Sequence, residues 1–78
     1  MEIKHGTRVY TTVSEDDPAD GFAAVNLIAE KNGIGTLAAR VVFWDADGQF
    51  ALEMKVPELP LRVVERLISE AKETIKTA

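Results

Sequence analysis

The chain has 78 residues, of which 46% are hydrophobic and 28% charged, and it carries a formal net charge of −4. This composition is typical of a folded globular protein, and the lack of cysteine excludes disulfides, thiolate metal sites and cysteine nucleophiles. No apolar run approaches the roughly 18 residues of a membrane span, and the first residues lack the hydrophobic core of a signal peptide. These features predict one small cytoplasmic domain over residues 1–78, and the acidic charge disfavours a broad nucleic-acid footprint.

The segment from Ile3 to Ser14 is rich in β-branched residues and predicts the first strand. The acidic cluster that follows is typical of a helix start and does not require a bound cation. Asp17 fits the N-cap position, Pro18 fits the first helical position, and Asp20 places negative charge on the positive end of the helix dipole.

The segment from Ala19 to Lys31 fits either a helix or a strand. At 100° per residue most of its apolar side chains fall on one arc, and its alanines favour a helix. Gly33 then ends that helix, with Ile34 in the hydrophobic contact of a Schellman motif. The competing interpretation makes Asn32-Gly33 a hairpin turn and the segment a strand.

The segment from Leu37 to Val56 predicts a β-hairpin whose tight type I′ turn is formed by Asp47-Gly48. Apolar residues alternate along both arms, so one face of this hairpin is expected to be buried. That face comprises Leu37, Ala39, Val41, Phe43, Phe50, Leu52, Met54 and Val56.

An amphipathic helix is predicted from Leu61 to the end of the chain, with Pro60 at its start. The predicted fold class is therefore α+β with the order β-α-β-β-α, in which both helices cover one face of a three-stranded sheet. The alternative is a four-stranded antiparallel meander followed by one C-terminal helix.

No catalytic, metal or cofactor motif is recognisable. The loop Asp45-Ala46-Asp47-Gly48 fails as a calcium site, because alignment of its glycine puts Phe43 and Met54 where carboxylates are required. His5 is the only histidine and has no carboxylate nearby in the sequence to orient it as a general base. The sequence therefore predicts a non-enzyme with no cofactor and no metal.

Strand alternation predicts a second face of the sheet that no element covers and that carries cations and aromatic rings. That face would carry four cations and a single carboxylate, Glu53, although the whole chain is acidic. An exposed apolar and cationic patch favours an interaction site, most simply a homodimer or another protein partner. The alternatives are single-stranded nucleic acid on the same face, or a solvated face without a ligand. The candidate interaction residues are Arg8, Tyr10, Arg40, Val42, Trp44 and Lys55.

Overall fold

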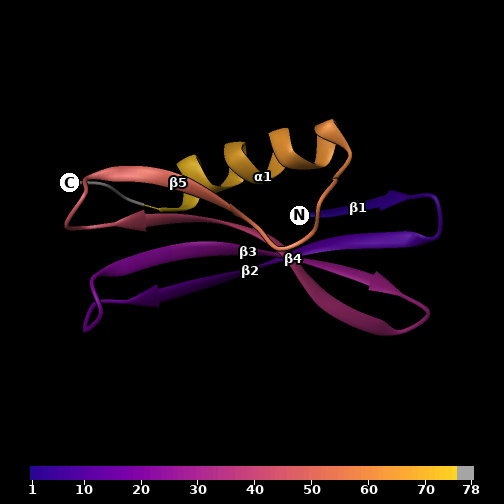
Figure 1. Ribbon diagram of the computed structural model, residues 1–78, viewed down its shortest axis with the longest axis horizontal. Coiled ribbons are helices and arrows are strands. Elements are labelled where there is room, and N and C mark those ends of the chain that lie inside the picture. The colour runs from indigo at the N-terminus through magenta and orange to yellow at the C-terminus, as the bar shows by residue number, and fades with distance from the viewer. Residues whose placement is uncertain (76–78) are drawn as a thin grey trace.

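The computed structural model describes residues 1–75 and shows a single small α+β domain, in which a five-stranded antiparallel meander is followed by one helix (Figure 1). The sheet order is β1-β2-β3-β4-β5, so every strand pairs with its neighbour in sequence. The helix α1 lies across one face of the sheet and contacts β3 and β4. The elements are β1 Glu2–His5, β2 Arg8–Asp17, β3 Phe22–Lys31, β4 Ile34–Trp44, β5 Gln49–Met54 and α1 Leu61–Thr74.

The prediction of a helix from Ala19 to Lys31 is wrong, because most of this segment forms the central strand β3. Its alternate residues Val25 and Leu27 are buried under α1, while Ala24 is buried on the opposite side of the sheet. A strand that is apolar on both faces shows no clean alternation, so its residues also fit a helical arc. The β-α-β-β-α order and the three-stranded sheet are wrong for the same reason.

Turn chemistry explains how the chain enters and leaves β3. Asn32 and Gly33 have φ angles of 54° and 81°, the two left-handed residues that a type I′ hairpin turn requires. At the other end, the side chain of Asp17 accepts the N–H of Asp20 at 3.0 Å. This is the bond expected of an N-cap, and here it stabilises the β2–β3 loop.

The predicted first strand consists of two strands, β1 and β2, which pair from Glu2 with Thr11 to His5 with Arg8. The four-stranded meander considered as the alternative therefore also lacks one strand.

The hairpin of β4 and β5 was predicted correctly, but its turn was not. Trp44 pairs with Gln49, which leaves a four-residue loop, and in this loop only Gly48 has a positive φ. A type I′ turn at Asp47-Gly48 would need positive φ at both residues. The amide N–H groups of Asp47 and Gly48 both donate to the carbonyl of Trp44.

The C-terminal helix is confirmed from Leu61 to Thr74, where Ile75 is an extended C-cap, and the predicted extension over 76–78 lies outside the described residues. Pro60 was expected as the first helical residue, but it is the N-cap, and its carbonyl accepts the N–H of Val63 at 3.0 Å. The apolar stripe of α1 packs on β3 and β4. The buried core comprises Tyr10, Val25, Leu27, Ala38, Ala39, Val41, Val63, Leu67, Ala71 and Ile75.

An irregularity in β4 overturns part of the predicted alternation. Leu27 pairs with Ala39 but Ile28 pairs with Leu37, so Ala38 is an extra residue, as in a β-bulge. Leu37 was expected to face the core, and the bulge instead puts it on the side of the sheet away from α1, where it is 39% exposed. Ala38 is buried in its place.

Candidate interaction surfaces

The side of the sheet opposite α1, here called the uncovered face, carries four of the six predicted interaction residues. Arg40, Val42 and Trp44 alternate along β4 on this face, and Lys55 follows β5 beside Glu53. Within residues 1–75 no helix or strand packs over this face. The predicted orientation of the last β4 residues is therefore confirmed.

Arg40 is the centre of a polar row that crosses the uncovered face. Its Nε donates to Glu53 Oε1 at 2.9 Å and its Nη2 donates to Glu53 Oε2 at 3.4 Å, which makes the pair bidentate. Glu15 Oε1 lies 4.0 Å from Arg40 Nη1 and accepts the side-chain N–H of Asn26 at 3.1 Å. Lys55 Nζ lies 3.8 Å from Glu53 Oε1. Two carboxylates thus neutralise the arginine.

A small apolar cluster lies beside this polar row. The rings of Phe22 and Trp44 pack at a centroid distance of 5.1 Å, and the guanidinium carbon of Arg40 lies 5.5 Å from the centroid of the Phe22 ring. To reach Phe22, the Arg40 side chain lies over the neighbouring pair Ala24 and Val42, both of which are 0% exposed. Val42 was expected to be available to a partner, but it is buried within its own molecule.

The predicted positive charge of the uncovered face is wrong. Strand register places five carboxylates and three cations on this face. The prediction failed because Arg8 lies on the other side of the sheet and because the acidic residues of β2 were not considered. The charged residues are Glu2, Glu15, Asp17, Glu30 and Glu53 with Lys4, Arg40 and Lys55.

Acid should weaken the pair of Arg40 and Glu53. The hydrogen bond from Arg40 holds the pKa of the Glu53 carboxyl below its usual value, against the opposing effect of partial burial. A carboxyl with a lower pKa in the folded state adds stability above its unfolded pKa of about 4.3, and this stability disappears as the pH falls through the folded value.

We therefore expect Glu53→Gln to lower the free energy of unfolding by about 0.2 to 1 kcal/mol at neutral pH. In urea denaturation at successively lower pH, the difference between the variant and the wild type should shrink as Glu53 becomes protonated. Glu58→Gln is the control, because this exposed carboxylate has no ion pair among residues 1–75. A Glu53→Gln effect that persists in acid would mean that packing, and not charge, explains the loss.

Arg8 and Tyr10 were assigned to the uncovered face, and this assignment is wrong. Tyr10 pairs with Ile3 and Ala29, lies on the same side of the sheet as α1, and is only 1% exposed. The alternation of valine and tyrosine in β2 shows that the two faces differ, but it does not show which one is covered. The helix covers the face of β2 that carries the ring of Tyr10.

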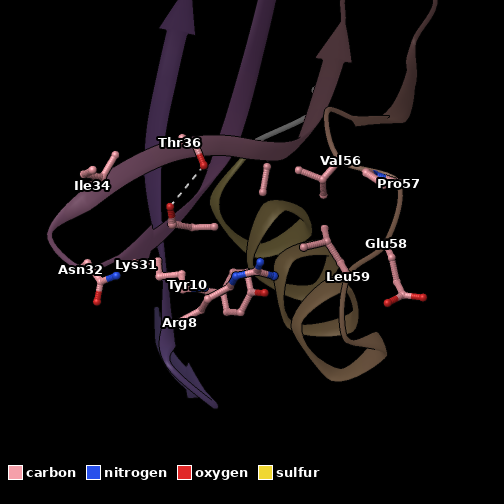
Figure 2. A pocket seen from close by; sticks show the side chains of 12 residues that line it. Arg8, Tyr10, Lys31, Asn32, Ile34, Thr36, Val56, Pro57, Glu58 and Leu59 are labelled. Carbon is pink, nitrogen blue, oxygen red and sulfur yellow. Dashed lines mark hydrogen bonds between the residues drawn. The ribbon is translucent and has the colours of Figure 1, made fainter.

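Arg8 and Tyr10 instead line a groove of about 700 Å³ on the helix side of the sheet (Figure 2). The hairpin of β3 and β4 forms one side of it, and the connection from β5 to α1 forms the other. The hydroxyl of Thr36 donates to the carbonyl of Ala29 at 3.4 Å within this lining. The groove is lined by Arg8, Tyr10, Ala29, Lys31, Asn32, Ile34, Thr36, Ala38, Val56, Pro57, Glu58 and Leu59.

Sequence reasoning missed Phe22, Glu15 and Asn26 on the uncovered face, and Lys31 and Ile34 in the groove. The first three follow from treating residues 22–31 as a strand, since Phe22 then lies opposite Trp44 and Asn26 opposite Arg40. The Asn32-Gly33 dipeptide was the available signal for that strand. The groove has no such signal, because residues far apart in the sequence form it.

Among residues 1–75 no cluster of acidic or histidine side chains is placed to hold a metal ion. The same part of the chain contains no helix that is long and apolar enough to cross a membrane. Comparison with known proteins found no matching protein family, no similar curated protein and no similar solved structure.

Proposed function

We propose that this protein is a small non-enzymatic interaction module that self-associates through the uncovered face of its sheet. The observation that carries the proposal is an apolar patch that crosses three strands of this face. Val13 on β2 is 56% exposed, Leu37 on β4 is 39% exposed, and Ile28 on β3 pairs with Leu37 between them. Exposed apolar patches of this kind are typical of protein interfaces.

The ion pairs of Arg40 remove one source of repulsion from an interface with a second copy of the chain, although carboxylates outnumber cations on this face. In a two-fold interface a residue near the axis lies close to its symmetry mate, so an unpaired cation there would be repelled. Arg40 is already neutralised by Glu53 and Glu15, and Arg8 lies on the other side of the sheet. The aromatic pair of Phe22 and Trp44 adds the kind of side chain that is enriched in interfaces.

Single-stranded nucleic acid is not supported as a second candidate. Stacking would need exposed aromatic rings with cations for the phosphates, yet Tyr10 is buried and the carboxylates outnumber the cations on this face. Carboxylates repel a phosphate backbone.

Val13→Glu tests the proposal, because it places a charge in the patch without touching the buried core. We expect the wild type to sediment as a dimer and the variant as a monomer with an unchanged circular dichroism spectrum. Trp44→Ala should weaken association less than Val13→Glu does, because Trp44 lies at the opposite end of β4 from Leu37 and therefore away from the centre of the patch.

Leu61→Glu is the matched control, since Leu61 is 72% exposed on the helix and lies away from the uncovered face. This variant should remain dimeric. A wild type that stays monomeric at every concentration, or a loss of dimer in Leu61→Glu as large as that in Val13→Glu, would contradict the proposal.

A further inference from the structure

The β4 strand has an open edge beside the groove. β5 pairs with β4 only from Ala39 to Trp44, and the amide of Lys55 adds one bond to the carbonyl of Ala38 at 2.8 Å. Within residues 1–75 no strand pairs with Ile34–Leu37 on this side, and all four residues are exposed. Alternate backbone N–H and C=O groups of this edge are therefore open to another strand.

The chemistry of this edge differs from that of the open edge of β2. β1 covers β2 only as far as Thr11, so Thr12–Asp17 is also unpaired on one side within the described residues. That segment carries Glu15, Asp16 and Asp17, and charged side chains protect a sheet edge from unwanted pairing. Ile34–Leu37 contains no charge at all, and Ile34 is 70% exposed.

The groove next to this edge has an apolar interior and an excess of positive charge. Ile34 from β4 and Val56 and Leu59 from the connection to α1 contribute its apolar surface. Arg8 and Lys31 also line it, and neither has a carboxylate within 4.0 Å among residues 1–75. Among residues 1–75 Glu58 is the only acidic residue that lines the groove, so the two cations outnumber it.

We infer that the β4 edge at Ile34–Leu37 binds an extended peptide in which acidic side chains flank an apolar one. The peptide continues the sheet in the space that β5 leaves open, and main-chain hydrogen bonds to the edge hold it. Alternate side chains then enter the groove beside Ile34 and Thr36. The apolar side chain packs on Val56 and Leu59, and the acidic ones reach Arg8 and Lys31.

This site shares Leu37 with the apolar patch, but its groove lies on the helix side of the sheet, so peptide binding does not require the proposed self-association. The chain as a whole is acidic and repels an acidic peptide. A preference for the acidic peptide over a basic one therefore reports the local charge of the groove.

The test uses the synthetic peptide acetyl-Glu-Thr-Val-Thr-Glu-amide, titrated into isotope-labelled protein and followed by NMR. We expect shift changes at the amides of Ile34–Leu37 and slower hydrogen exchange there. Arg8→Glu and Lys31→Glu should each weaken binding roughly tenfold. The matched control is Lys4→Glu, because Lys4 is an exposed cation on the other side of the sheet, and this variant should bind as the wild type does.

Two further peptides separate charge from strand pairing. A peptide with lysine in place of both glutamates should not shift the signals of residues 34–37. A peptide with N-methylated backbone amides keeps the side chains but cannot donate the main-chain bonds, and it should not bind either.

Four results would overturn the inference. The first is that millimolar acidic peptide leaves the signals of residues 34–37 unchanged. The second is that the N-methylated peptide binds as tightly as the unmethylated one. The third is that Lys4→Glu weakens peptide binding as much as Arg8→Glu does. The fourth is a shift of the Ile34, Gly35 and Thr36 signals with protein concentration alone in the Val13→Glu variant, which would make a second copy of the chain the occupant of the edge. Val13→Glu, which tests the uncovered face, should leave peptide binding unchanged.

Discussion

Replacing Tyr10 with alanine is expected to lower the free energy of unfolding by about 3 to 5 kcal/mol, as for other large aromatic residues removed from a core. Tyr10 is 1% exposed and belongs to the cluster that includes Leu27 and Leu67. Its removal leaves a cavity between β2 and α1 that the surrounding sheet cannot fill. A domain of 78 residues has few other contacts to offset such a loss.

Urea denaturation followed by circular dichroism measures this loss. Tyr10→Phe is the matched control, because it keeps the ring and removes only the hydroxyl, and it should cost far less. If Tyr10→Ala lowered stability by less than about 1 kcal/mol, Tyr10 would not be a core residue, and the sheet would present its other face to the helix.

Leu67→Ala is expected to cost about 2 to 5 kcal/mol, the usual range for a buried leucine. Leu67 is fully buried at the middle of α1, in the same cluster as Val41 and Val25. The helix contacts the sheet through a single apolar stripe, so a cavity there weakens the attachment of the whole helix. Thermal unfolding should move to a clearly lower midpoint.

Leu61→Ala on the same helix provides the comparison. Leu61 is 72% exposed, so its replacement should change stability by no more than about 0.5 kcal/mol. Equal losses in Leu61→Ala and Leu67→Ala would mean that helix propensity, and not burial, determines the effect. Phe43 and Leu52 were both expected on the buried face of the hairpin, yet Leu52 is 43% exposed on the edge strand β5.

The two interaction surfaces differ in how far the sequence could predict them. Alternation along β4 placed Arg40, Val42 and Trp44 on the uncovered face correctly, because Ala39 to Trp44 is a regular strand. The burial of Val42 was not predictable, since it depends on the Arg40 side chain lying toward Phe22 across the neighbouring strand. The groove was not predicted at all.

The sequence by itself determined the elements whose signals are local. The stripe of α1, the proline before it and the alternation from Ala39 to Trp44 each depend on residues a few positions apart. These signals identified the last helix and the hairpin of β4 and β5.

Only the tertiary structure decided that residues 22–31 form a strand and that Tyr10 lies in the core. β3 is flanked on both sides by other strands, and it carries apolar residues on both of its faces. Because these residues do not alternate with polar ones, the pattern fits a helical repeat as well as a strand repeat. The bulge at Ala38 likewise reverses the face of Leu37 without any change in the sequence pattern. Pairing with distant strands settled these choices, because hydrogen bonds and burial across the sheet outweigh the weak local preferences of these residues.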